Sequence, residues 1–324
     1  MSNDRLMNSH AMAFPGPTFM QVPAGQVDDV VAGGFAIIGA PFGSAYTVPG
    51  IAPGAARAPH AIRSASARYH AFAGRYDFDL QGPFFDPAGV GLLDLGDCFG
   101  PVHDPSQHVA IIEETVRSAA VLSALPIVLG GDDSTPIPIC AGLDAFTDIH
   151  VLQIDAHLDY RDNVDGHRCG YSSPMRRIRE MSHVAKIVHV GARGIGSAHV
   201  SDHDDTLEAG NAIVTAREVV REGVGVALQH FPDGANVYIS IDCDGFDPSV
   251  MPGTSVPLPG GLQFYDGVDM IRDLVSRCNL RGIGFAEHYP EFDNHNLTSV
   301  AITRLISNTI GATLSRRQTA KEAI

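Results

Sequence analysis

Short apolar runs that alternate with longer amphipathic segments constrain the fold of this chain more than any other feature. The runs are apolar on both faces, which is typical of strands covered on both sides in a parallel sheet. The expected strands are Phe35–Gly39, Ile127–Leu129, Ile149–Ile154, Ile187–Val190, Asn236–Ile241 and Gly282–Phe285. Helical periodicity is found over His108–Ala124, Phe264–Cys278 and Leu297–Thr313. This alternation predicts βαβ units in a three-layer α/β/α sandwich with a central parallel sheet.

The length of the chain, 324 residues, permits either two domains or one large α/β unit. No internal repeat and no low-complexity linker marks a boundary, so we expect residues 31–324 to form a single α/β domain. Residues 1–30 are polar and contain glycine and proline. They are predicted to form an N-terminal arm that packs on a neighbour or stays loose.

Composition excludes several classes of function. A net charge of −15 argues against nucleic acid or an anionic membrane surface as a partner. The sequence has no uninterrupted run of ~18 apolar residues, as a membrane span requires, and no secretory signal pattern. The five cysteines are scattered and form no CxxC pair. We therefore expect a cytoplasmic protein with reduced, mostly buried thiols.

Acidic residues follow four of the predicted strands. In parallel α/β sheets, ligands bind beyond the carboxyl ends of the strands. The segments at these ends are Gly130–Ser134 (GGDDS), Asp155–Asp159 (DAHLD), Asp242–Asp247 (DCDGFD) and Glu287. We expect their carboxylates, together with the imidazole of His157, to meet at one rim of the sheet.

So many carboxylates at one rim repel one another unless cations compensate their charge. Asp155, His157 and Asp159 alternate along a segment expected to be extended, so their side chains should point to the same side. Asp242 and Asp244 repeat this spacing. An oxygen-rich site with one or two imidazoles is typical of Mn(II), with Co or Ni as alternatives, and differs from a thiolate-type zinc site. Two divalent ions ~3.5–4 Å apart would hold a hydroxide between them at neutral pH.

Each motif alone has a simpler interpretation. A single DxD is common at helix caps and turns, and the Gly-Gly-Asp segment is also typical of a tight turn. Three such elements at successive strand ends favour a metal site. Cys243, between two of the aspartates, should face the core. No GxGxxG motif opens a helix, Ser134 and Ser240 lack a nucleophile elbow, and Cys169 near His167 is a weak candidate thiol nucleophile.

Three segments, GGDDS, DAHLD and SIDCDGFDPSVMPGTSVPLPGG, resemble the signature blocks of the ureohydrolase superfamily, which comprises arginases, agmatinases and related amidinohydrolases. The segment GAPFGSAYTVPGIAPGAARAPHAIR is similar to the Gly/Pro-rich loop on the substrate side, and GFAEHYPEFD is similar to the block whose glutamate holds the guanidinium group. The resemblance covers nearly the whole chain and is closer to the agmatinase branch. It implies an arginase-like fold, a trimer or hexamer, and cleavage of a C–N bond at a guanidino carbon by a metal-bridging hydroxide.

The resemblance also implies a role for each residue of the site. The implied ligands of two divalent ions, Mn(II) or Ni(II), are Asp133, Asp155, His157, Asp159, Asp242 and Asp244. Asp155 and Asp242 would bridge the two ions. Asp133 and Asp159 would complete one metal site, and His157 and Asp244 the other. Asp159 would also orient the hydroxide and pass its proton to the leaving amine, while Glu287 would pair with the guanidinium.

The chain departs from the family at several positions. Asp133 replaces the usual histidine. Either its carboxylate binds the metal directly and makes an all-oxygen site that favours Mn, or the shorter side chain reaches the metal only through a water. Tyr171 aligns with a histidine that serves proton transfer or substrate contact in agmatinase-like enzymes. We expect Tyr171 to line the pocket; His167 could replace it only if the loop is rearranged. Ser255 and Val256 replace the usual Gly and Thr, again on the substrate side.

These departures leave the substrate open within a class of small cationic molecules. Agmatine, guanidine, guanidinobutyrate and the biguanide metformin are the candidates, and the apolar Val48, Ile51 and Val256 would suit a short or methylated tail. The alternative is a low-activity or non-catalytic subunit that supports an active homologous chain in a hetero-oligomer such as a metformin hydrolase. Asp133 and Tyr171 motivate that alternative. His288, beside Glu287, is expected to be a satisfied structural histidine.

Overall fold

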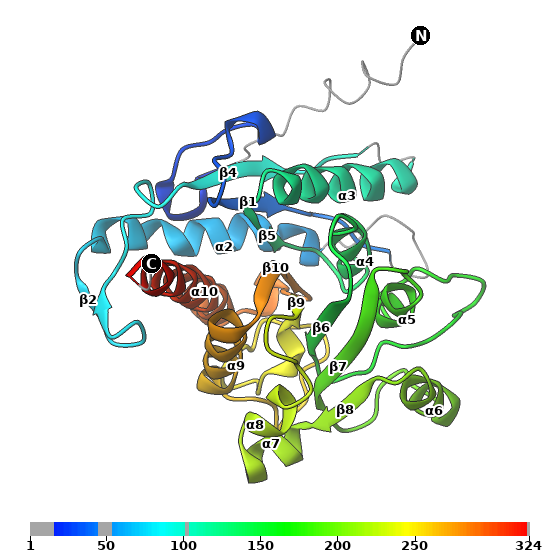
Figure 1. Ribbon diagram of the computed structural model, residues 1–324. Helices are drawn as coiled ribbons and strands as arrows, with labels where there is room; N and C mark the ends of the chain where they lie inside the picture. The colour runs from blue at the N-terminus through cyan, green and yellow to red at the C-terminus, as the bar shows by residue number, and fades with distance from the viewer. Residues whose placement is uncertain (1–15, 45–53, 101–103, 323–324) are drawn as a thin grey trace.

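The computed structural model describes residues 16–44, 54–100 and 104–322 and is built on an eight-stranded sheet (Figure 1). The strands are β1 (Phe35–Gly39), β4 (Leu92–Asp97), β5 (Leu125–Leu129), β6 (Ile149–Ile154), β7 (Val184–Ala192), β8 (Ala212–Thr215), β9 (Asn236–Asp242) and β10 (Asn279–Ala286). Their order is β4-β1-β5-β10-β9-β6-β7-β8, and every neighbouring pair is parallel. A separate antiparallel pair joins β2 (Tyr76–Asp77) to β3 (Gly82–Pro83).

Helices cover both faces of the sheet. One face packs against α2 (Ala58–Ser66), α7 (Ala216–Glu222), α8 (Gly225–Leu228), α9 (Phe264–Arg277) and α10 (Leu297–Glu322). The other face packs against α3 (Pro105–Val121), α4 (Pro136–Ala141) and α5 (Pro174–Arg179), while α6 (Val200–Glu208) lies beside β8. Short 3-10 turns lie at Phe19–Gln21, Val27–Asp29, Ala55–Arg57, Ala67–Phe72, Cys243–Gly245 and Pro290–Phe292. The predicted three-layer α/β/α sandwich is confirmed.

Successive residues of each strand contribute to two separate cores. Ile37 and Ile127 belong to the core under α2, α9 and α10, whereas Ile38 and Val128 belong to the core under α3, α4 and α5. Side chains of a strand alternate between its two faces. A strand that is buried on both faces therefore has no polar side, and this explains why the strands stand out as continuous apolar runs in the sequence.

All six predicted strands and all three predicted helices are present, with small differences at their ends. The first predicted helix begins at Pro105, where Asp104 caps it by accepting a hydrogen bond from the backbone of Gln107 at 3.2 Å. The last one continues beyond Thr313 to Glu322. Two strands of the eight-stranded sheet, β4 and β8, and the short antiparallel pair β2–β3 are not among the predicted strands.

The described part of the N-terminal segment packs on its own chain. Phe19 and Met20 are fully buried. The Phe19 amide donates to Oδ2 of Asp94 at 2.7 Å, and the Met20 amide donates to the hydroxyl of Ser66 at 2.8 Å. The boundary at residue 30 stays a prediction, and Val48 and Ile51 lie outside the described residues. Of the helices within residues 16–44, 54–100 and 104–322, none is long and apolar enough to cross a membrane.

Candidate metal centre

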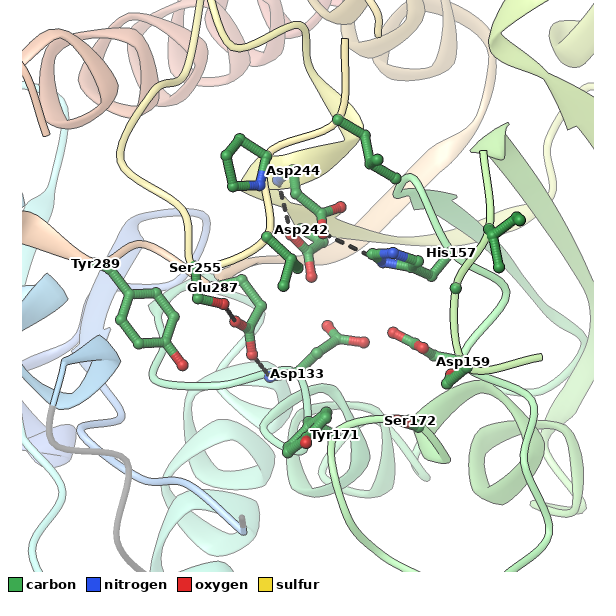
Figure 2. A pocket seen from close by; sticks show the side chains of 16 residues that line it. Asp133, His157, Asp159, Tyr171, Ser172, Asp242, Asp244, Ser255, Glu287 and Tyr289 are labelled. Carbon is green, nitrogen blue, oxygen red and sulfur yellow. Dashed lines mark hydrogen bonds and ion pairs between the residues drawn. The ribbon is translucent and has the colours of Figure 1, made fainter. Parts of the chain in front are cut away.

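The four strands whose ends carry the predicted ligands are neighbours in the sheet, in the order β5, β10, β9 and β6. Their register brings the ends level with one another. Phe285 on β10 lies opposite Leu129 on β5, Ala286 lies opposite Asp242 on β9, and Ile154 on β6 lies opposite Ile241. Because all four strands are parallel, the residues after them meet at one edge, as predicted from the sequence (Figure 2).

The loop after β5 explains the order of residues in GGDDS. A Cβ on Gly131 would lie 1.7 Å from the carbonyl oxygen of Phe42, so only glycine fits there. The Asp132 carboxylate accepts hydrogen bonds from the backbone of Ser134 at 3.0 Å and of Ser44 at 2.7 Å. Asp132 thus holds the loop in place, and the next residue, Asp133, points toward the other carboxylates (Figure 2).

The segment after β6 brings its three ligands together differently from the prediction. It bends instead of continuing as a strand, and Asp159 adopts a positive φ of 42°. The His157 amide donates to Oδ1 of Asp155 at 2.6 Å, and its ring Nδ1 lies 3.2 Å from Oδ2 of Asp244. The expectation of an extended segment is wrong, because this backbone turns around the Asp155 carboxylate. The expected grouping of the three side chains is nevertheless present.

The end of β9 is held by the carboxylates it carries. The Asp244 amide donates to Oδ1 of Asp242 at 2.7 Å, and Oδ1 of Asp244 accepts from the Ala156 amide at 3.1 Å. Cys243, between them, is fully buried within the apolar core, as expected. A Cβ on Gly245 would lie 2.6 Å from the Asp155 backbone nitrogen. Glycine at this position therefore permits the ends of β9 and β6 to approach each other closely.

Glu287 links the end of β10 to the loop after β5. Its amide donates to the carbonyl of Gly131 at 2.9 Å, and its Oε1 accepts from the Asp133 amide at 2.9 Å. Its other carboxylate oxygen lies 3.5 Å from the Ser255 hydroxyl. Glu287 has a positive φ of 58°, which like that of Asp159 is an unfavourable conformation for a residue with a side chain. Such strain gathers at functional sites, where the surrounding structure enforces it.

The ligand atoms form two overlapping groups in which all atoms lie within 4.8 Å of one another. One group is Asp133, Asp155, Asp159 and Asp242, and the other is Asp155, His157 and Asp159. The first is the set that the resemblance implies for one metal. Oδ2 of Asp133 is buried and has no hydrogen-bond partner. A buried carboxylate oxygen without a partner is costly unless a cation satisfies it.

The charges of the site support the same conclusion. Burial, followed by repulsion from Asp159 and Asp155, raises the pKa of Asp133 well above its usual range. Burial and neighbouring carboxylates also raise the pKa of Asp155 to about 6 and that of Glu287 to about 8. Burial alone would lower the pKa of His157, but hydrogen bonds to Asp155 and Asp244 raise it to about 11. Divalent cations would relieve this repulsion and keep the carboxylates ionised. The residues present therefore fit a pair of such ions.

A cavity of about 540 Å³ opens above this cluster. Tyr171 and Ser255 line it as predicted, while His167 is not among the described residues that form its wall. Sequence reasoning missed further lining residues: Ser172, Ile195, Gly196, Ser197, Pro257, Leu258 and Tyr289. Tyr289 could have been noticed, since it follows Glu287 by two residues in the HYPEFD segment. His288 is structural as expected, because its ring nitrogens lie 3.2 Å from the Gly253 carbonyl and 2.8 Å from the Ser299 hydroxyl.

The wall of the cavity has two chemically different parts. Carboxylates and His157 form its floor, and Ile195, Val256 and Leu258 form an apolar part near the mouth. Ile195 is 94% exposed and Val256 is 52% exposed, so both side chains face solvent at the entrance. Among the described residues that line the cavity, none is a lysine or an arginine.

Comparison with known proteins identifies relatives along nearly the whole chain. The model of the arginase family matches residues 34–311. An N(1)-aminopropylagmatine ureohydrolase of Thermus thermophilus is 30% identical over 80% of this chain and 84% of its own length. An agmatinase of Pyrococcus horikoshii is 29% identical over 90% of this chain and 95% of its own length. The solved structure of proclavaminate amidinohydrolase from Streptomyces clavuligerus superimposes with a TM-score of 0.79 and 26% identity, covering 95% of this chain and all of that one.

Proposed function

This chain belongs to the arginase family of hydrolases that act on linear amidines, and we propose that it cleaves a C–N bond at the guanidino carbon of a small cationic substrate. The buried, unpartnered Oδ2 of Asp133 is the observation that carries the proposal. Burying a carboxylate oxygen without a partner costs free energy, so its presence among the other carboxylates favours a role in holding a cation. A bound cation gives that oxygen its missing contact.

We assign two Mn(II) ions to the site. The group formed by Asp133, Asp155, Asp159 and Asp242 offers only oxygen atoms, which suits Mn(II) better than softer metals. His157 and Asp244 would complete the second position, since Nδ1 of His157 and Oδ2 of Asp244 lie 3.2 Å apart. Ni(II) is the alternative that metal analysis has to test.

Two divalent ions held by these residues would supply a hydroxide at neutral pH and would stabilise the negative charge that develops when it attacks the guanidino carbon. The side chains have separate tasks around it. The Asp159 carboxylate, held by the bend after β6, orients the nucleophile and moves its proton to the leaving amine. Glu287, fixed by the amide of Asp133, pairs with the guanidinium. Its ionised form is needed for that pairing, and the cations of the site favour ionisation.

The cavity wall narrows the class of substrate. A substrate with a carboxylate tail needs a cationic partner, and the described lining residues include none. A tail without a carboxylate has no such requirement and would pass Val256 and Leu258 near the mouth. We propose a small guanidino or biguanide cation without a carboxylate, so guanidine, agmatine and metformin should be better substrates than guanidinobutyrate.

The test is a turnover assay on these four compounds that measures release of urea or of the amine product. The wild type, loaded with Mn(II) or Ni(II), is compared with Asp155→Asn and Asp242→Asn. Asp204→Asn, an exposed carboxylate on α6, is the matched control. We expect turnover that both site variants abolish and the control retains. Full activity in both site variants would refute the mechanism, and preferred cleavage of guanidinobutyrate would refute the substrate class.

A further inference from the structure

A second cavity, of about 310 Å³, lies at the opposite edge of the sheet, where β5 and β10 begin. Three arginines line it: Arg281 on β10, and Arg316 and Arg317 on α10. We call it the arginine pocket. Glu287 follows Arg281 by six positions along β10 and just past its end, which at 3.3 Å per residue is about 20 Å. The arginine pocket is therefore distinct from the metal centre.

Neutral groups hold each of the three guanidinium groups in place. Arg281 donates from Nε to Oδ1 of Asn236 at 2.8 Å, and its guanidinium lies 4.2 Å from the centre of the Phe146 ring. Arg316 donates to the Val275 carbonyl at 3.1 Å and to the carbonyl of Cys278. Arg317 donates to the carbonyl of Gly33 and lies over the ring of Phe35. These contacts use only some of the five N–H groups of each arginine.

No described Asp or Glu lines the arginine pocket or forms an ion pair with its three arginines. Two arginines that are withdrawn further from water do have carboxylate partners. Arg63 pairs with Asp94 and Asp97, and Arg304 pairs with Asp77 and Asp79. Carboxylates are abundant in this protein, which has a net charge of −15. The three arginines of the arginine pocket have no described carboxylate partner, so they leave a local excess of positive charge.

That charge is partly withdrawn from water. Burial, with added repulsion from Arg316, lowers the pKa of Arg281, and burial lowers the pKa of Arg317. Holding half-buried cations close together costs free energy, which an opposite charge normally offsets. Guanidinium groups offer several N–H donors in fixed directions, and these match the oxygens of a phosphate group.

We propose that the arginine pocket binds a phosphate group, as free phosphate or as a small phosphate monoester. The N–H groups of Arg281 and Arg317 that are not used in the contacts above would donate to its oxygens. The cavity is wide enough for an organic part beside the phosphate, and Ala124 and Leu125 provide an apolar wall for it.

The test is calorimetric titration of the metal-loaded protein with inorganic phosphate, and separately with glycerol phosphate, at constant ionic strength. The double variant Arg281→Gln with Arg317→Gln is compared with the wild type. A control, Arg217→Gln with Arg221→Gln, removes the same charge from exposed positions on α7. Phosphate that binds at the metal centre is common to all three proteins and does not affect the comparison.

We expect one phosphate per chain to bind in the wild type and the control with an affinity at least tenfold higher than in the double variant. Tighter binding of glycerol phosphate would identify a monoester as the ligand, and tighter binding of inorganic phosphate would identify the free ion. Equal affinity in all three proteins, or no phosphate bound outside the metal centre, would overturn the proposal. Circular dichroism checks folding; if the double variant is unfolded, Arg281→Lys replaces it, which keeps the charge and loses the planar donor geometry.

Discussion

Asp133 stands at a position where the resemblance to the ureohydrolase superfamily implies a histidine. In the structure its carboxylate lies with those of Asp155, Asp159 and Asp242 in one group of oxygen ligands. An Asp133→His variant would introduce a nitrogen ligand. We expect it to bind Zn(II) more tightly relative to Mn(II) than the wild type does, because imidazole suits zinc and carboxylate suits manganese. Competitive metal binding measures this ratio, and an unchanged ratio would show that position 133 does not contact a metal.

From the sequence, Tyr171 and His167 are alternative candidates for lining the substrate pocket. The structure places the two residues in different surroundings. Tyr171 lines the cavity above the carboxylates, whereas the backbone of His167 pairs with that of Val164 in the loop before it. Tyr171→Ala should raise KM severalfold with a smaller effect on kcat, because the ring contacts substrate away from the reacting carbon. His167→Ala serves as the matched control and should keep KM within about twofold of wild type. A larger KM effect in His167→Ala than in Tyr171→Ala would reverse the assignment.

At the residue scale, the floor of the site is predictable from sequence, whereas most of its wall is not. The ligands directly follow strands, so locating the strands also locates Asp155, Asp242 and Glu287. The wall consists of residues such as Ile195, Leu258 and Tyr289, which lie on loops far apart in the sequence. The path of a loop depends on what it packs against, and no local pattern of residues encodes that.

At the scale of elements, β4 illustrates why the hydrophobic pattern does not predict two strands of the eight-stranded sheet. Its sequence, LLDLGD, carries two aspartates, which a buried parallel strand normally lacks. Both pair inside the protein with Arg63 of α2, which donates to Asp94 at 2.8 Å and also pairs with Asp97. Asp94 also accepts the amide of Phe19. Because the compensating charge is some 30 residues away in sequence, the hydrophobic pattern alone cannot show this strand. The other missed strand, β8, has four residues at the sheet edge and is too short to give a pattern.

This ion pair is expected to stabilise the edge of the sheet. Arg63→Met would leave two buried aspartates without their cation and should lower the free energy of unfolding by about 3–5 kcal/mol. Arg57→Met is the matched control, since its pair with Glu291 is largely exposed and should contribute no more than about 1 kcal/mol. Urea denaturation measures both. Equal effects of the two substitutions would contradict the role of β4 as a strand held by buried charge.

At the scale of the whole molecule, a buried histidine on β7 makes stability depend on pH. His189 is fully buried, and burial lowers its pKa to about 3, against 6.5 for an ordinary histidine. Between these values only the unfolded chain binds the proton, so stability falls as pH decreases from 6.5 toward 3. In His189→Gln, the change in the free energy of unfolding over this pH range should be smaller than in the wild type by up to about 1.4 kcal/mol per pH unit. Denaturation at several pH values tests this, and parallel curves for the two proteins would contradict it.

The architecture as a whole explains why the site could be anticipated at all. Each parallel strand ends at the same edge, and the four strands that bear ligands are adjacent in the centre of the sheet. The strand order, however, depends on contacts between distant segments and was not predictable from one sequence. The expected trimer or hexamer, and an additional homologous chain, stay predictions.

We propose that the carboxylates at the ends of β5, β6 and β9, together with His157, form a centre for two divalent ions. Elemental mass spectrometry of the purified chain, after growth with manganese and nickel supplied, tests it most directly. We expect about two metal ions per chain, most of them manganese, and a marked loss of metal in Asp155→Asn, whose carboxylate belongs to both groups of ligand atoms. One ion or none in the wild type would contradict the proposal of a binuclear centre and would indicate that Asp133 does not hold a metal.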